Sequence, residues 1–303
     1  PVYKAISRIC SNLPGTGQEM TAFTDLISVT DLQNLLETAA VRVVDCRFNL
    51  MDTGQGEREF LEGHIPGAVY AHLDDDLASP ITPESGRHPL PDIDKFVRAL
   101  GDWGIGNDTQ VVVYDHSNGA VAARLWWMLR WLGHDKVAVL DGGFAAWTKA
   151  RAPVEASVAD HPRSTFVPAP NSAMIATTAE IAAAVAAGDE LNLVDARDAA
   201  RYSGEIEPID TAAGHVPGAL NLPFPGGVHE DGTWRDAGHH RRAWDALLAG
   251  RPEKPLIAMC GSGVTACHLL ISARLSGRPA PRLYVGSWSE WIRDKQRPVE
   301  TSK

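Results

Sequence analysis

Short apolar runs alternate along the chain with longer stretches in which apolar residues recur at helical spacing. The runs VVVYD (111–115) and LIAMC (256–260) show no polar alternation, which is typical of strands buried on both faces of a parallel sheet. The stretches 30–40 and 122–133 have the periodicity of helices. This alternation predicts an α/β fold in which helices flank parallel sheets.

The second half of the chain repeats the first half. Five blocks match in the same order: 43–47 with 193–197, 63–68 with 214–219, 111–115 with 256–260, 140–147 with 284–291, and 153–155 with 298–300. Because the blocks keep a nearly constant offset, the chain consists of two copies of one domain.

The repeat also sets the expected domain boundaries. We expect one domain over residues 20–155 and a second over 177–303, joined by a linker at 156–176 that contains three prolines. Residues 1–19 show no clear period. They are expected to form an extension, either added or native, with an amphipathic targeting peptide as the alternative.

Composition excludes several classes of protein. The net charge is −10 and no segment is dense in Lys or Arg, which argues against a nucleic-acid partner. Uncharged stretches are interrupted before they reach the ~18 residues of a membrane span. Four cysteines in 303 residues do not form a disulfide scaffold. Cys260 and Cys267 also lack the spacing of a zinc or redox pair, so we expect no metal, reduced thiols and a cytoplasmic location.

Cys260 stands at the carboxyl end of an apolar run and precedes Gly-Ser-Gly. Ligands of open parallel sheets bind beyond the carboxyl ends of the strands. Gly261 and Gly263 permit a tight turn whose amides, with the N-terminus of the next helix, form an anion site. We therefore expect Cys260 to shift toward thiolate and to carry a persulfide, Cys–S–S⁻. Asp115 holds this position in the first copy, which predicts that the N-terminal domain is inactive.

Two other interpretations of this loop remain. Cys260 could be a buried structural cysteine in a non-catalytic binding module. A cysteine phosphatase would need an arginine at the end of the loop to bind a phosphoryl dianion, but Thr265, Ala266 and Cys267 stand there. The uncharged loop favours sulfur chemistry over phosphate chemistry.

These motifs resemble the rhodanese superfamily, and specifically its two-domain sulfurtransferases. The resemblance covers residues 29–300 and depends most on CGSGVTAC (260–267) and GSWSEW (286–291). It implies two tandem rhodanese-like domains, each a parallel sheet flanked by helices. The Gly-Ser-Gly loop is similar to that of 3-mercaptopyruvate sulfurtransferases, whereas thiosulfate sulfurtransferases carry basic residues there. Thiosulfate is therefore the alternative donor.

The resemblance also implies a two-step reaction without a metal or an organic cofactor. Cys260 takes sulfur from 3-mercaptopyruvate, pyruvate leaves, and the persulfide passes its outer sulfur to a thiol, cyanide or a thioredoxin-like acceptor. The family pairs the loop serine, here Ser262, with a histidine and an aspartate of the first domain. By motif the histidine is assigned to His64 in GHIPGA, and the aspartate to Asp52, which lies on the segment before it.

The donor's carboxylate is expected to bind Arg201 in ARYSG, which matches the family's substrate arginine. The other expected substrate-binding residues are Gly261, Gly263, Val264 and Thr265. Some family members read Glu-Pro-Arg where this chain reads Glu207-Pro208-Ile209, so a second carboxylate-binding arginine is missing there. Arg235, Arg241 and Arg242 are candidates to replace it, but their spacing selects none of them.

Overall fold

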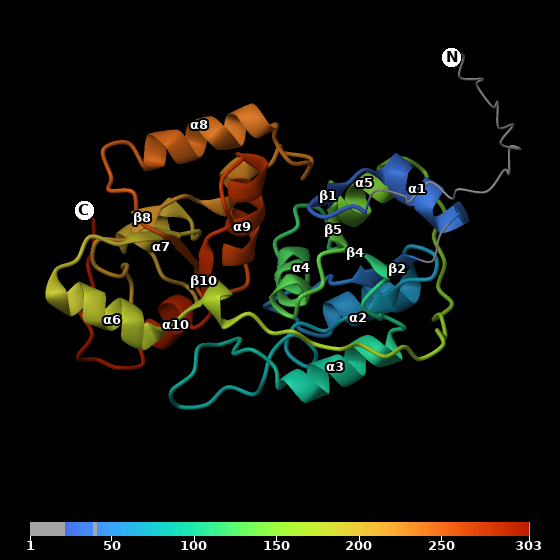
Figure 1. Ribbon diagram of the computed structural model, residues 1–303, viewed down its shortest axis with the longest axis horizontal. Coiled ribbons are helices and arrows are strands. Elements are labelled where there is room, and N and C mark those ends of the chain that lie inside the picture. The colour runs from blue at the N-terminus through green and yellow to red at the C-terminus, as the bar shows by residue number, and fades with distance from the viewer. Residues whose placement is uncertain (1–21, 39–40, 303) are drawn as a thin grey trace, which may run out of the picture.

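The computed structural model describes residues 22–38 and 41–302. These residues form two α/β units that lie side by side, each around a five-stranded sheet (Figure 1). All the strand pairs within both sheets are parallel. The extension predicted at 1–19 lies outside the described residues.

The first unit orders its strands β1-β5-β4-β2-β3. Its elements in chain order are β1 (Leu26–Ile27), α1 (Val29–Thr38), β2 (Val41–Asp45), α2 (Gln55–Glu62), β3 (Val69–Tyr70), α3 (Ile93–Asp102), β4 (Gln110–Tyr114), α4 (Ala122–Trp131), β5 (Val137–Leu140) and α5 (Gly143–Lys149). The central strand β4 is buried along nearly its whole length, as its unbroken apolar pattern predicts.

The second unit orders its strands β6-β10-β9-β7-β8, which is the order of the first unit in new numbers. Its elements are η1 (Ser172–Met174), β6 (Ile175–Ala176), α6 (Thr178–Ala187), β7 (Asn192–Asp195), α7 (Ala199–Ser203), β8 (Leu220–Asn221), η2 (Phe224–Gly227), α8 (Ala237–Leu247), β9 (Leu256–Met259), α9 (Ala266–Leu275), β10 (Arg282–Tyr284) and α10 (Ser287–Trp291). The predicted duplication and the α/β class are confirmed. η1 and β6 lie inside the segment that the sequence assigned to the linker.

The two units share a core where α4 and α9 pack against each other, in the middle of the molecule (Figure 1). Trp127 of α4 and Leu270 of α9 are fully buried in the same hydrophobic cluster. Nearly all residues of α4 and α9 are buried, as expected for helices that are covered on every side between two sheets. No helix in the described part of the chain is long and apolar enough to cross a membrane.

Candidate active site

The catalytic loop joins β9 to α9 and begins at Cys260. Gly263 has φ +77°, and a Cβ on it would lie 2.4 Å from the carbonyl oxygen of Val285. Only glycine fits there, so the turn that the sequence predicted is fixed by the neighbouring backbone. The backbone N–H of Cys260 donates to Ser287 Oγ at 3.1 Å, which anchors the start of the loop.

The sulfur of Cys260 lies inside this turn and the residue is 1 % exposed. The Gly263 N–H donates to Sγ at 3.2 Å. The sequence predicted a ring of amides around the sulfur. Of the amides in the described residues, only that of Gly263 has hydrogen-bond geometry toward it.

The first unit shows what this turn can hold. Asp115 occupies the position of Cys260, and its carboxylate accepts hydrogen bonds from four backbone amides: Ser117 and Gly119 on Oδ1, Val121 and Ala122 on Oδ2, at 2.9–3.2 Å. The turn is therefore an anion site, which the chain's own carboxylate fills in the N-terminal unit. In the C-terminal unit the equivalent position carries a thiol.

Ser262, two residues after the cysteine, is bonded to a residue of the other unit. Its Oγ lies 2.7 Å from Nδ1 of His88, and Nε2 of His88 lies 3.2 Å from Asp74 Oδ1. When the proton is on Nε2 of His88, this N–H points to Asp74, and Nδ1 accepts a hydrogen bond from the Ser262 hydroxyl. The long connection between β3 and α3, which supplies both residues, extends below the second unit beside α10 (Figure 1).

This arrangement corrects the assignment of His64 and Asp52. His64 is fully buried, bonds the Phe60 carbonyl through Nδ1 at 2.6 Å and stacks on the Phe60 ring. His215 makes the same contacts with Tyr202 in the second unit. The GHxPGA histidine is thus structural in both copies.

Asp52 lies on the surface in an ion pair with Arg58 at 2.6 Å, and its side chain is 52 % exposed. The partner of Ser262 is instead His88 in SGRHPLPD (85–92). One sequence signal was available. This motif has no counterpart in the second half, as expected for a residue that serves a single site.

Burial determines the protonation of this serine–histidine pair. Burial, together with the positive charges of the nearby Arg124 and Arg87, lowers the pKa of His88 to about 3. Burial also raises the pKa of Asp74. His88 is therefore neutral at physiological pH, as a group that accepts a proton from a hydroxyl must be.

Arg201, the predicted carboxylate ligand, lies close to the catalytic loop. A Cβ on Gly261 would lie 3.6 Å from Arg201 Nη2 and 2.8 Å from Nη2 of Arg87, a residue of the first unit. Arg201 also donates to Glu207 at 2.8 Å and to Asp210 at 3.1 Å. Arg87 is not among the site residues that the sequence predicts.

A fully buried arginine of α4 holds the segments of the site together. Arg124 donates to the carbonyl oxygens of Gly263 at 3.2 Å, His88 at 3.0 Å and Leu77 at 3.3 Å. These oxygens belong to the catalytic loop, the histidine segment and the connection before it. Arg124 therefore fixes the Cys260 loop relative to His88 across the boundary between the units.

The substrate-binding roles predicted for Val264 and Thr265 remain predictions. Val264 is buried and Thr265 precedes the first residue of α9. Cys267 is fully buried, and burial raises its pKa to about 12, so it stays a thiol. Among the described residues, no group of three or more His, Cys, Asp or Glu side chains could hold a metal ion.

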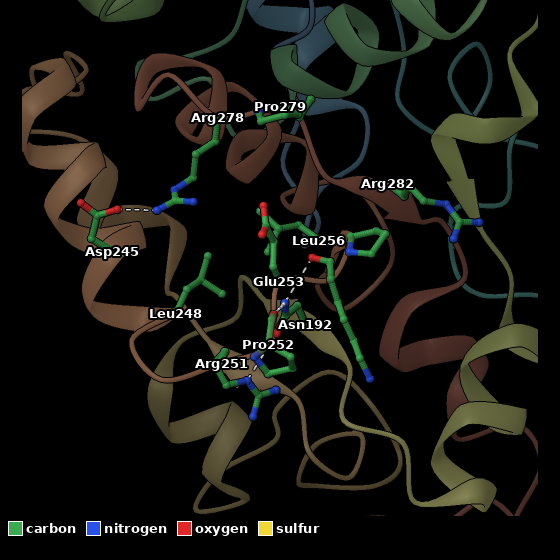
Figure 2. A pocket seen from close by; sticks show the side chains of 13 residues that line it. Asn192, Asp245, Leu248, Arg251, Pro252, Glu253, Leu256, Arg278, Pro279 and Arg282 are labelled. Atoms are coloured by element: carbon green, nitrogen blue, oxygen red, sulfur yellow. Dashed lines mark hydrogen bonds and ion pairs between the residues drawn. The ribbon is translucent and has the colours of Figure 1, made fainter.

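A cavity of about 550 Å³ opens at the opposite edge of the second sheet, where β7, β9 and β10 begin. Figure 2 shows Arg278 directed toward Asp245 and Arg251 beside Asn192. Arg251 also pairs with Glu190 at 3.0 Å. The arginines that line this cavity are already paired. The cavity also lies away from the carboxyl ends of the strands, where ligands of open parallel sheets bind, so the Cys260 loop is the better candidate site.

Comparison with known proteins agrees with this geometry. The rhodanese-like domain model matches residues 28–150 and 177–294. A probable 3-mercaptopyruvate sulfurtransferase of Pseudomonas aeruginosa is 44 % identical over 91 % of this chain and 98 % of its own. The thiosulfate sulfurtransferase of Bos taurus is 35 % identical over 86 % of this chain and 87 % of its own.

Solved structures give the same result. The crystal structure of SseA from Escherichia coli, titled as a 3-mercaptopyruvate sulfotransferase, is 32 % identical with a TM-score of 0.75, and the match covers 88 % of this chain and 100 % of SseA. Two matched domains and close relatives of nearly equal length establish that the chain belongs to the rhodanese family of sulfurtransferases.

Proposed function

We propose that the protein transfers sulfur from 3-mercaptopyruvate through a persulfide on Cys260 and releases pyruvate. The observation that carries this proposal is the Ser262–His88 hydrogen bond, which places a proton-accepting imidazole beside the thiol loop. The loop itself has no cation, which suits a donor whose transferable sulfur is a thiol rather than part of a dianion.

In the first step the Cys260 thiolate attacks the donor's sulfur and an S–S bond forms as the C–S bond breaks. The electron pair of the C–S bond stays on the methylene carbon, giving the pyruvate enolate. The donor's thiol loses one proton and this carbon gains one, so the step is balanced in protons. Ser262, bonded to His88, is placed to relay it, while Asp74 orients the imidazole.

The Cys260 persulfide then passes its outer sulfur to an acceptor. The turn that holds the Asp115 carboxylate in the first unit supports an anion at this position in the second. We propose a thiol, cyanide or a thioredoxin-like protein as the acceptor, in the cytoplasm. Cys46, Cys260 and Cys267 are free thiols, which is consistent with a reducing compartment.

Steady-state kinetics with 3-mercaptopyruvate and thiosulfate on one preparation tests the proposal. We expect a higher kcat/KM for 3-mercaptopyruvate, and mass spectrometry should find one added sulfur atom on the Cys260 peptide. Cys260→Ser should lower pyruvate release by a factor on the order of 10⁴ or more, because the nucleophile is lost. If only thiosulfate is turned over, thiosulfate replaces 3-mercaptopyruvate as the proposed donor. If Cys260 takes up no sulfur, the protein is a binding module.

A further inference from the structure

A second cavity, of about 300 Å³, lies between η2, α8 and α9 of the second unit, where α8 packs against α9 (Figure 1). Apolar side chains such as Leu222, Phe224 and Leu269 form part of its wall, together with His240 and His268. Among the described residues that line it, none is Asp, Glu, Lys or Arg, and none belongs to the catalytic loop. The cavity is therefore a separate, uncharged space.

Two buried histidines converge on one point in the wall of this cavity, beside Gly227. His240 is 1 % exposed and His268 is fully buried. A Cβ on Gly227 would lie 3.2 Å from Cε1 of each ring and 3.8 Å from Nδ1 of His268. Because Cε1 is bonded to both ring nitrogens, each imidazole turns a polar edge toward this point. Glycine leaves open the space that the two edges share.

The ring nitrogens on these edges lack hydrogen-bond partners. Nε2 of His240 is buried without one, and so are both ring nitrogens of His268. Nδ1 of His240 lies 2.8 Å from Ser272 Oγ, which also accepts the Trp244 indole N–H at 3.1 Å. Most buried polar groups in folded proteins are hydrogen-bonded, so two unpartnered edges in one cavity indicate a molecule that pairs with them.

The protonation of the two rings selects the chemistry of that molecule. Burial lowers the pKa of His240, and burial together with the neighbouring His240 lowers the pKa of His268 to about 3, so both rings are neutral at physiological pH. A neutral imidazole offers one N–H donor and one acceptor nitrogen. A charged molecule would lose its hydration here without gaining an opposite charge. A hydroxyl group, which both accepts and donates, matches the two edges.

The Ser272 contact indicates which ring donates. Ser272 Oγ accepts from Trp244, and its own hydroxyl hydrogen can then go to Nδ1 of His240. This arrangement puts the His240 proton on Nε2, where the N–H faces the cavity as a donor. Nδ1 of His268, close to the same point, can serve as the acceptor.

We propose that this cavity binds a small neutral molecule that carries a hydroxyl group on an apolar ring, as phenols do. The hydroxyl oxygen accepts from Nε2 of His240, and its hydrogen is donated to Nδ1 of His268. The ring of the ligand packs against Leu222, Phe224 and Leu269. The inference goes beyond the proposed function, because it concerns a site that shares no residue with the Cys260 loop.

Titrations of the full chain with phenol and with toluene, followed by ligand-observed NMR, test the proposal. The two molecules have nearly the same size and differ in a hydroxyl against a methyl group. We expect a Kd for phenol on the order of 0.1–1 mM. Toluene should bind about 5-fold more weakly or worse, because it leaves the ring nitrogens unpaired. A crystal soaked in phenol should place the hydroxyl between His240 and His268.

Two variants remove different parts of the site. His268→Phe keeps a flat ring without nitrogens, and it should abolish the preference for phenol over toluene. Gly227→Ala puts a methyl group at the point where the two edges meet, and it should weaken the binding of both molecules about 5-fold or more. His134→Phe is the matched control. His134 is 2 % exposed and both its ring nitrogens lack partners, but it packs against Phe166 away from this cavity. Its loss should leave both affinities within about 2-fold of the wild type.

Equal affinities of the wild type for phenol and toluene would overturn the inference, since the ring nitrogens would then take no part in binding. A preference for phenol that survives in His268→Phe would also overturn it, as would a soaked crystal in which the cavity holds only ordered water. These outcomes leave the proposed function intact, because it is tested separately by turnover at Cys260.

Discussion

At the scale of single residues, surroundings rather than residue type decide what each histidine does. His64 and His215 bond backbone carbonyls and stack on aromatic rings, so they stabilise a turn. His88 has a hydroxyl on one ring nitrogen and a carboxylate near the other. His268 is fully buried against Trp234, their ring centroids 3.8 Å apart, and neither of its ring nitrogens has a hydrogen-bond partner.

His268 should make the protein less stable in acid. Burial lowers its pKa to about 3, while the unfolded chain binds a proton near pH 6.5. Between these values the unfolded state holds more protons, so the stability present above pH 6.5 is lost as the pH falls toward 3. At pH 5 this loss is about 2 kcal/mol, and His268→Phe, which keeps a flat ring without titratable nitrogens, should abolish it.

Urea unfolding at pH 7 and pH 5 measures this difference. The variant should lose less stability than the wild type on acidification, with similar dependence on urea at both pH values. Equal losses in the two proteins would mean that His268 is protonated in the fold.

The residue scale also shows what the sequence could predict about the site. Cys260 and Arg201 were found because a strand end and a short motif carry local information. The motif that contains His64 is present in both halves, and such a repeat favours a shared structural role over a role in one site. Arg87 and His88 reach the site through a long connection from the other unit. Their motif stands out because it has no counterpart in the second half, but the sequence does not show which loop it contacts.

At the scale of elements, the helices and strands that could be predicted are those with a strong hydrophobic pattern in the sequence. β4 and β9 were recognised because each is a continuous apolar run at the centre of its sheet. The two-residue strands β1, β3, β6 and β8 are too short to show any period, and they exist because they pair with a longer neighbour. α4 was predicted as a helix, but its role in the active site depends on one buried arginine.

Removing the charge of Arg124 should weaken the fold and the catalysis together. In Arg124→Met, the carbonyl oxygens of Leu77, His88 and Gly263 lose a buried donor. We expect a loss of about 3–5 kcal/mol in unfolding free energy, because three buried carbonyl oxygens are left without their donor. Because the loop and His88 lose their common anchor, kcat should also fall, as measured on protein that remains folded.

Arg130→Met on the same helix is the control for this effect. Arg130 pairs at 2.9 Å with Asp135, donates to the Thr24 carbonyl at 3.4 Å and lies over the Trp126 ring. None of these contacts reaches the Cys260 loop or His88, so its loss should leave kcat unchanged and cost less stability than the loss of Arg124. Equal effects of the two variants would assign the loss to α4 as a whole.

At the scale of the whole molecule, duplication has produced one site from two domains. The first unit keeps the anion-binding turn but fills it with the Asp115 carboxylate. It also supplies His88 and Asp74, which lie beside the turn of the second unit. The two copies are thus no longer equivalent. Among the described residues, the hydroxyl, the imidazole and the arginines come together at Cys260, so we expect that a thiol in the turn alone does not suffice for catalysis.

Moving the thiol to the first unit tests this conclusion. The double variant Asp115→Cys with Cys260→Ser places a nucleophile in a turn that binds anions but that His88 does not reach, since His88 is bonded to Ser262. Pyruvate release should remain at the level of Cys260→Ser alone. The single variant Asp115→Cys, which retains Cys260, should keep wild-type turnover. Its free energy of unfolding should fall by about 2–4 kcal/mol, because four amides lose a charged acceptor. Recovery of pyruvate release in the double variant would contradict this conclusion. It would show that the turn and the thiol suffice, and that His88 and Asp74 are dispensable.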